Sequence, residues 1–339
     1  LHLLSRRQRQ MCIRDRFLST ILFFISSCNE SDLSEVPSAH QIPKAGKTLQ
    51  SSFISGLQSW EARRVSEMVS NGQKILLSYL DNNTTKAILL NNSNSETPVT
   101  LSSFNLRTSQ LFERHTSLRT RSGASDSSVI QLPDSLNTLR AIRADNYIIA
   151  TGLYTQGRYL LYDLNTKTFG FHLSYPEHPV YPVLREDTKA ILYASTVLKV
   201  RPDNRYFVCG DMYSGNLEFC RITGDHIERI KAYCYHHPRV YITEKTIPDV
   251  AYSRDNRFGF TDITVTSEKV YTIYSGHTYR ENPKTFQQCR KLLVFDWEGT
   301  LLETYALDIP LTHVTVDASE HALYAIGHEP TTHLSLIHI

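Results

Sequence analysis

"YIIATGLYTQGRYLLYDLNTKTF", at residues 147–169, is the first of three stretches that share one plan. The others are "YFVCGDMYSGNLEFCRITGDHI" at 206–227 and "VYTIYSGHTYRENPKTFQQCRKLLVFDWEGTLLETY" at 270–305. Each stretch reads as an apolar strand, a glycine, a polar loop, a second strand, a tight turn and a third strand. A fourth copy, "ALYAIGHEP" at 322–330, begins in the same way and stops after its glycine.

The spacing of these repeats is typical of a β-propeller. Their glycines recur at intervals somewhat longer than the roughly 40–50 residues of common propeller repeats, and the inserted loop 279–288 lengthens one interval. A further strand precedes the later copies, and similar turn residues recur at 202–205, 254–257 and 317–320. Four strands per unit, joined as hairpins, predict radially arranged sheets. The glycines are Gly152, Gly210, Gly276 and Gly327.

The sequence predicts an all-β, six-bladed β-propeller over residues 47–333. Nineteen Tyr and fourteen Phe favour strands over helices, and less regular segments such as "QKILLSYLDNNTTKAILL" at 73–90 leave room for two more blades. The stretch 59–70, "SWEARRVSEMVS", stays unassigned between helix and strand. The last blade is expected to be truncated after His333, which would expose an unpaired strand edge.

The two ends of the chain do not read as protein sequence. Residues 1–16 and 334–339 resemble a translated transposase sequencing adapter, because "MCIRDR" at 11–16 and "LSLIHI" at 334–339 have reverse-complementary codons. The alternative for the first end is a basic arm that binds nucleic acid or an anionic membrane. Removing the five Arg and one Asp of residues 1–16 changes the balance from 36 basic and 34 acidic residues to 31 and 33. The remaining chain has no basic cluster, so nucleic acid is not an expected partner.

Residues 17–27 read as a truncated lipoprotein signal peptide. The apolar run Phe17–Ile25 is too short to span a bilayer, which takes about 20 residues, and "ISSC" at 25–28 resembles a bacterial lipobox. Cys28 is therefore the expected lipidation site, and an ordinary signal with an incidental cysteine is the alternative. Polar residues 28–46 are expected to form a tether. These features predict a lipid-anchored protein of the bacterial cell envelope, on the periplasmic or surface side of the outer membrane.

From residue 137 to 330, the chain resembles the TolB-like six-bladed propeller lipoproteins of Gram-negative bacteria. The resemblance rests on "NYIIATGLYTQGRYLLYDLNT", "SYPEHPVYP", "KAILYASTVLKVRPDNRYFV" and "LLVFDWEGTLLETYALD", behind a lipobox. It is poor from residue 29 to 133. The resemblance implies a fold and a location, because the biochemical function of that family is itself unassigned.

Loops that follow the repeated glycines are expected on one face, because they occupy the same place in successive blades. Two interblade connections, "YPEHP" at 175–179 and "YHHP" at 235–238, are expected there too. Tyr and Arg are enriched at binding surfaces, whereas local packing of Tyr and Pro in solvated loops is the alternative. The candidate ligand-binding residues are Tyr154, Arg158, Asp211, Tyr213, His277, Tyr279, Arg280 and His328.

No metal site is expected from the histidines. Three or four ligands must converge on a zinc or copper ion, and the adjacent His236 and His237 point apart on an extended chain. Calcium is the cofactor of the enzymatic alternative, a lactonase or esterase with an ion at the propeller channel. Asp211, Asp262 and Glu329 offer the oxygen ligands that Ca²⁺ prefers, but no acidic motif recurs on the inner strands. A serine hydrolase is less supported, since there is no G-x-S-x-G motif.

Four cysteines remain after the adapter and the lipobox: Cys209, Cys220, Cys234 and Cys289. A hairpin over loop 213–216 is expected to place Cys209 opposite Cys220, where an oxidising periplasm would permit a disulfide. Two buried free thiols are the preferred interpretation.

Taken together, the residues predict a membrane-anchored, non-catalytic binding module for an unknown protein, peptide or glycan. The alternative is a calcium-dependent hydrolase on the same scaffold.

Overall fold

The quoted repeats fold as four-stranded antiparallel sheets in the computed structural model. The stretch around Gly152 lies in a sheet ordered β12-β11-β10-β9, and that around Gly210 in a sheet ordered β13-β14-β15-β16. Their middle strands are almost fully buried, because a neighbouring blade covers each face. The strands are β9 (Thr138–Ala144), β10 (Tyr147–Gly152), β11 (Tyr159–Asp163), β12 (Phe169–His172), β13 (Thr196–Val200), β14 (Tyr206–Asp211), β15 (Asn216–Thr223) and β16 (His226–Cys234).

The structure describes residues 40–55, 57–63, 65–70, 75–81, 84–90, 99–116, 126–243, 245–317 and 320–339. The expected adapter at 1–16, the signal at 17–27 and Cys28 lie outside the described residues. Residues 40–46, expected at the end of the tether, already lie against the propeller: His40 donates its backbone N–H to the Cys234 carbonyl at 3.2 Å.

Four further blades complete the propeller. The first two are three-stranded sheets, and the last two share the long strand β22, which leaves one blade and enters the next. The strands are β3 (Val65–Ser70), β4 (Ile75–Asp81), β5 (Thr84–Leu90), β6 (Val99–Asn105), β7 (Gln110–Thr116), β8 (Asp126–Gln131), β19 (Phe260–Val265), β20 (Lys269–Tyr274), β21 (Cys289–Asp296), β22 (Leu301–Val316), β23 (Ala322–Gly327) and β24 (His333–His338).

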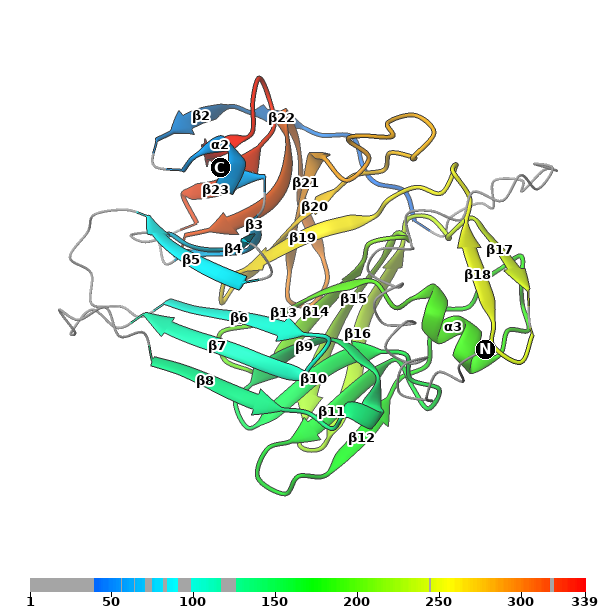
Figure 1. Ribbon diagram of the computed structural model, residues 1–339. Helices are drawn as coiled ribbons and strands as arrows, with labels where there is room; N and C mark the ends of the chain where they lie inside the picture. Colours follow the sequence, from blue (N-terminus) through cyan, green and yellow to red (C-terminus); the bar gives the residue numbers. More distant parts are fainter. Residues whose placement is uncertain are drawn as a thin grey trace, which may run out of the picture.

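The inner strands of successive blades close a ring. Contacts run from β3 to β6, β9, β13, β19 and β22, and from β22 back to β3. Figure 1 shows the blades fanned in chain order, with the blue N-terminal strand β2 (Ser51–Ile54) beside the red C-terminal strands. The prediction of a six-bladed, all-β propeller is therefore confirmed.

The expected unpaired edge after His333 is wrong. Residues 333–338 form β24, which pairs with β23 on one side and with β2 on the other, so strands from both ends of the described chain complete the last blade. Leu334 is buried in the cluster that also holds Leu57 and Ile326. An apolar hexapeptide pairs with an open strand edge whatever DNA encodes it, so the adapter origin of 334–339 stays a prediction. A short strand β1 (Lys47–Leu49) pairs in parallel with β22.

One of the turns expected from the sequence, at 254–257, lies at a different position in the chain. Residues 201–205 turn between β13 and β14, as predicted, with the Asn204 N–H donating to the Arg201 carbonyl at 2.8 Å. Residues 254–257, however, precede the inner strand β19, and the equivalent turn lies at 266–269. The unassigned segment 59–70 divides into helix α2 (Ser59–Ala62) and strand β3.

Two interblade insertions pack together beside the ring. Helix α3 (Glu186–Leu192) precedes β13, and the hairpin of β17 (Val240–Thr243) and β18 (Asp249–Tyr252) precedes β19. Their apolar side chains share one buried cluster, in which Leu192 and Tyr193 meet Val240. A short 3-10 helix (Asp134–Leu136) precedes β9. Within the described ranges, no helix is long and apolar enough to cross a membrane.

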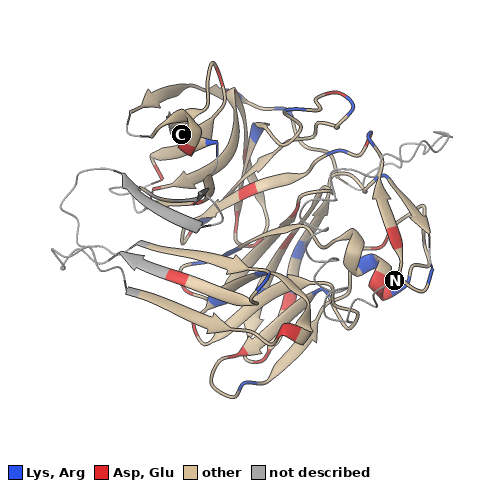
Figure 2. Cartoon of the chain, viewed as in Figure 1, with Lys and Arg blue, Asp and Glu red and all other residues tan. Residues whose placement is uncertain are grey.

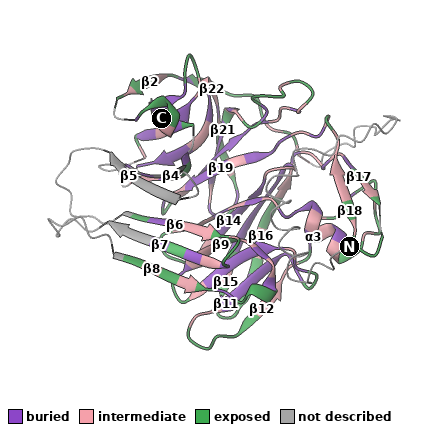
Figure 3. Ribbon diagram, viewed as in Figure 1, coloured by how far each residue is buried: buried purple, intermediate pink, exposed green. Residues whose placement is uncertain are grey.

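Buried apolar side chains form separate clusters between successive blades. Ile149 and Leu161 of one blade meet Phe207 of the next, and Phe219 meets Phe260 across the following interface. Figure 3 shows that buried residues concentrate in the strands of these blades, whereas the outer turns are exposed. The loops therefore stand on a rigid, packed scaffold.

Candidate functional site

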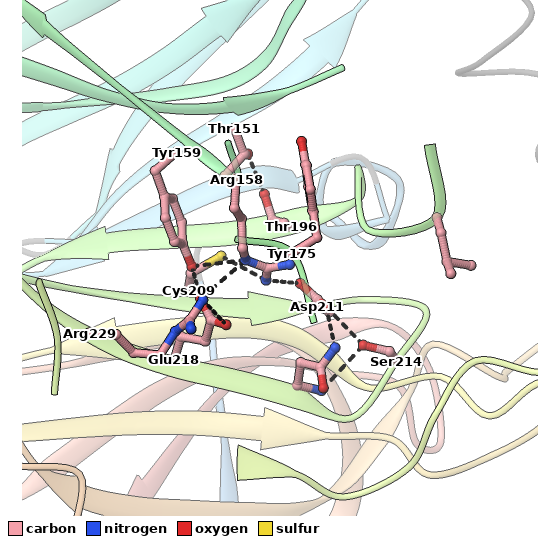
Figure 4. A network of polar contacts seen from close by, with 12 residues as sticks. Thr151, Arg158, Tyr159, Tyr175, Thr196, Cys209, Asp211, Ser214, Glu218 and Arg229 are labelled. Carbon is pink, nitrogen blue, oxygen red and sulfur yellow. Dashed lines mark hydrogen bonds and ion pairs between the residues drawn. The ribbon is translucent and has the colours of Figure 1, made fainter. Parts of the chain in front are cut away.

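The densest polar cluster joins the blade of β9–β12 to the blade of β13–β16 (Figure 4). Arg158 stands just before β11, and its Nη2 donates to Asp211 Oδ1 at 2.7 Å, at the end of β14. Its Nε lies 3.2 Å from Glu218 Oε2, on β15. The Tyr159 hydroxyl donates to the same Glu218 oxygen at 2.5 Å. One guanidinium thus connects three strands across the interface.

Both carboxylates have further partners. Asp211 Oδ2 accepts hydrogen bonds from Ser214 Oγ at 2.8 Å and from Asn216 Nδ2 at 3.0 Å. Glu218 Oε1 lies 3.2 Å from Arg229 Nη2. Asp211 therefore faces one guanidinium and Glu218 faces two, and each carboxylate also has at least one neutral donor, which is the arrangement that buried charges require.

Burial sets the electrostatics of this cluster. Arg158 is 1% exposed and Asp211 is 2% exposed. Burial by itself lowers the pKa of Arg158, but Asp211 and Glu218 raise it well above its usual value, so the guanidinium stays charged. Burial raises the pKa of Asp211, although Arg158 and Asn216 act in the opposite direction. Arg158 Nη1 and the Tyr193 hydroxyl are buried without a hydrogen-bond partner among the described residues. The cluster holds two blades together and presents no activated nucleophile.

Three of the eight predicted ligand-binding residues are buried and are not exposed on the loop face. Tyr154 is 2% exposed and shares a 2.8 Å hydrogen bond with Thr138, and Arg158 and Asp211 face each other inside the cluster. Tyr213 is half-buried and stacks on Tyr252 of β18, with ring centroids 4.6 Å apart. The structure brings Arg158 and Asp211 together as a buried ion pair, and neither side chain is exposed on the loop face.

Three other predicted residues, His277, Tyr279 and Arg280, lie on the loop between β20 and β21. Arg280 is exposed and makes two bonds to the Asp255 carboxylate, at 2.6 and 3.1 Å. The Tyr279 ring lies 5.6 Å from that of Phe286. The eighth residue, His328, lies apart on the last blade, where its Nε2 and Nδ1 contact the hydroxyls of Thr312 and Thr332 at 2.9 and 3.2 Å. Whether the eight residues bind a ligand stays a prediction.

The two repeated connections pack against each other. His178 of "YPEHP" donates from Nε2 to the Pro238 carbonyl of "YHHP" at 2.8 Å, and Tyr175 and Tyr235 are buried. In these connections, local packing accounts for the Tyr and Pro residues.

A groove of about 600 Å³ lies between residues 42–45 and the loop that begins at Ser275. Gly276 of the repeat motif forms part of its wall, with a backbone φ of 71°, and a Cβ there would lie 2.9 Å from the Tyr274 ring. Only glycine takes this conformation easily. The charged and titratable residues of the lining are Lys44, Arg257, His277, Glu281, Arg290 and Lys291.

No three His, Cys, Asp or Glu side chains converge as a metal site in the part of the chain that the structure describes. The three carboxylates considered for calcium lie in different blades. Asp262 accepts backbone bonds from Ile263 and Val314, both at 2.9 Å, Asp211 faces Arg158, and Glu329 lies 2.5 Å from Arg290. These three carboxylates do not converge on a common site.

The expected pairing of Cys209 with Cys220 is wrong by two residues. Cys209 lies opposite Glu218, and Cys220 lies opposite Phe207. Both thiols are free and fully buried, which agrees with the preferred interpretation. Since each lies between blades, they pack as small apolar side chains.

Sequence reasoning missed Tyr159, Glu218 and Arg229 of the buried cluster. A signal for Glu218 exists, because a lone carboxylate in the run "NLEFC" at 216–220 interrupts a strand that is otherwise buried on both faces. Such a charge needs a buried partner. The sequence does not reveal that the partner is Arg158, on the neighbouring blade.

Three solved structures match this chain at low sequence identity and with TM-scores below 0.5. "Structure of U3-55K" matches with a TM-score of 0.40 and 8% identity, over 79% of this chain and 75% of that chain. The Cps50 (Swd1) β-propeller domain of Myceliophteria thermophila matches with a TM-score of 0.37 and 10% identity, over 89% and 99%. A putative 6-phosphogluconolactonase from Bacteroides uniformis matches with a TM-score of 0.39 and 13% identity, over 78% and 74%. No curated protein sequence matches the chain.

The family comparison is more specific. A sequence model described as TolB-like 6-blade propeller-like matches residues 68–319, which is more than half of the chain. The observed ring of six blades agrees with that description. This chain therefore belongs to the TolB-like 6-blade propeller-like family.

Proposed function

We propose that this protein is a non-catalytic binding module, tethered to the cell envelope, that takes its ligand on the loop face of the blade β19–β22. The observation that carries the proposal is the groove of about 600 Å³ beside His277. Small-molecule sites in proteins have this size, and loops on rigid scaffolds commonly carry them.

The loop that lines the groove is fixed by its own hydrogen bonds. The Thr278 N–H donates to Glu281 Oε2 at 3.0 Å, and the Glu281 N–H donates to Thr278 Oγ1 at 3.1 Å. The Ser275 hydroxyl donates to the Phe286 carbonyl at 2.5 Å, which holds the two ends of the loop together. A loop fixed in this way loses little conformational entropy when a ligand binds.

Another wall of the groove comes from residues 42–45 of the strap, the name used here for residues 40–46 at the end of the expected tether. His40 binds the end of β16 through two bonds, its N–H donating to the Cys234 carbonyl at 3.2 Å and its Nδ1 accepting from the Cys234 N–H at 3.1 Å. Ile42 packs on the cluster between the blades. A lipid on Cys28 would therefore hold the protein by a segment that runs directly into the binding groove.

Site-specific photo-crosslinking tests the binding function. A benzophenone side chain at Tyr279, on the loop face, is expected to give a discrete adduct in intact envelopes. The same group at Asn165, an exposed position in the turn between β11 and β12 of another blade, is the matched control and should give none. Equal labelling from both positions, or none from Tyr279, would contradict the proposal.

Fractionation tests the tether. Expressed behind a complete lipoprotein leader, the protein should partition with membranes and carry an acylated Cys28. The Cys28→Ala variant should become soluble, because two or three acyl chains supply the anchoring energy. Membrane association that persists in this variant would count against lipid anchoring.

A further inference from the structure

We infer that the groove binds a small organic anion that carries a carboxylate or phosphate group, an inference that rests on the proposed function and adds the chemical class of its ligand. Four cationic side chains line the groove, Lys44, Arg257, Arg290 and Lys291, against one carboxylate, Glu281. Figure 2 shows basic and acidic residues interspersed along the chain, so this excess of cations is local.

Two of the four cationic side chains form no ion pair with the described residues. Lys44 and Lys291 are exposed, and neither ammonium group has an ion-pair partner among the described residues. They approach the groove from different segments, since Lys44 belongs to the strap and Lys291 to the start of β21. Two ammonium groups from different segments of the lining can bind one anionic group.

Both arginines of the lining donate a hydrogen bond to a backbone carbonyl group. Arg257 Nη1 donates to the Gly276 carbonyl at 3.0 Å. Arg290 Nη1 donates to the Asp308 carbonyl at 2.6 Å, and its Nη2 lies 2.5 Å from Glu329. Glu329 offsets the charge of Arg290, so Lys44 and Lys291 are the cations that would bind the charged group of a ligand.

The single carboxylate of the lining is directed into its own loop. Glu281 accepts the backbone N–H of Thr278, and this bond is the main reason that its pKa is lowered. The negative charge of Glu281 therefore stabilises the conformation of the loop through this hydrogen bond. Lys44 and Lys291, which also line the groove, can therefore bind the charged group of a ligand.

The rest of the lining favours an organic ligand over an inorganic ion. Ile42, Pro43 and Ala45 on the strap and Ala306 on β22 also line the groove. These apolar side chains can contact the carbon skeleton of a ligand, while the cations select its charged group. His277 adds a polar contact: its Nδ1 bonds Asn282 Nδ2 at 3.1 Å, and its Nε2 has no hydrogen-bond partner within the described ranges.

Isothermal titration of the full chain with three ligands that share a hexose skeleton tests the inference. Glucuronate supplies a carboxylate, glucose 6-phosphate supplies a phosphate, and glucose is the neutral control. At least one anion is expected to bind at a single site, more weakly as salt is added, while glucose does not bind. The relative affinities of the two anions identify the preferred group.

Matched charge variants locate the site. The double variant Lys44→Gln/Lys291→Gln is expected to weaken anion binding at least tenfold. The double variant Lys245→Gln/Lys284→Gln removes the same charge from exposed positions outside the groove and should change the affinity less than twofold. Equal losses in both variants would overturn the inference. So would no binding of either anion up to about 10 mM, at which a ligand with a Kd of about 1 mM would nearly saturate the site.

The two proposals fail in different ways. If crosslinking at Tyr279 succeeds and neither anion binds, the loop face binds another class of ligand. If neither experiment succeeds, the loop face of this blade is not the binding site.

Discussion

Replacing Arg158 with Met removes the guanidinium that lies between Asp211 and Glu218. The methionine side chain retains much of the packing volume, so the main loss is electrostatic. Two carboxylates that are 2% exposed would remain between the blades without their shared counter-ion. We expect this variant to be strongly destabilised.

The magnitude follows from the contacts. Removing one partner of a buried ion pair costs about 3–5 kcal/mol, because the other charge stays desolvated. Arg158 is paired at 2.7 Å with Asp211 and at 3.2 Å with Glu218, which places it at the upper end of that range. Domains of this kind unfold with a total free energy of about 5–15 kcal/mol, so the variant should lose a large share of its stability.

Equilibrium unfolding in urea, followed by the fluorescence of the buried Trp297, measures the change. The control is Arg221→Met, because Arg221 pairs with Glu228 at 2.6 Å on the surface, with side chains 46% and 54% exposed. An exposed pair contributes at most about 1 kcal/mol. A loss below about 1 kcal/mol for Arg158→Met, or equal losses for both variants, would refute the reasoning.

A triple variant separates lost charge pairing from lost packing. Arg158→Met with Asp211→Asn and Glu218→Gln leaves no uncompensated buried charge in place of the cluster. Replacing a whole buried ion cluster with neutral groups is often close to neutral in free energy. The triple variant should therefore be more stable than Arg158→Met alone, and a lower stability would show that packing dominates.

Three further predictions concern the glycine motif, the pH dependence and the thiols. Gly276→Ala should destabilise the protein by at least about 1 kcal/mol more than Gly224→Ala in urea unfolding. Both glycines have a positive φ, but only a Cβ at Gly276 meets a neighbouring ring, at 2.9 Å. Burial raises the pKa of Asp262 to about 7, above about 3.9 in the unfolded chain. Its contribution to stability is thus fully present below about pH 4 and is lost as the pH rises through 7, a trend that Asp262→Asn should remove from the unfolding free energy. Burial raises the pKa values of Cys209 and Cys289 to about 12, so a maleimide should label both only after unfolding, as mass mapping would detect.

Each of these expectations has a clear contrary result. Equal losses for the two glycine variants would mean that the ring contact at Gly276 is relieved by a small shift. An unchanged pH trend in Asp262→Asn would assign the trend to another group. Rapid labelling of Cys209 in the native protein would show that the interblade interface opens.

Most of the fold could be predicted from the sequence. The apolar strands, the repeated glycines and the turns at 202–205 specify hairpin-linked sheets, because strand alternation and turn chemistry act over a few residues. The insertion that packs α3 against β17–β18 was not predicted, since its contacts join segments about 60 residues apart. The predicted pairing of Cys209 with Cys220 was also wrong. Loop length alone does not fix the residue at which a tight turn starts, because side-chain packing also selects it.

The candidate site was predicted less well. His277 was assigned to the loop face and does line the groove. Arg158 and Asp211 were assigned to the same face, yet the structure turns both inward, into the interface between blades. A loop position in the sequence does not state which way its side chain points, and a buried charge is possible only where a partner on another blade neutralises it.

The sequence by itself determined an all-β repeat, the number of its blades and the expectation of a lipid tether, because these depend on local patterns of residues. Only the tertiary structure decided which residues meet: the pairing of β2 with β24 that completes the last blade, the guanidinium of Arg158 between two carboxylates, and the cationic groove beside the strap. Each of these joins segments far apart in the chain. Their free energy depends on burial and distance in three dimensions, which no spacing along the sequence contains.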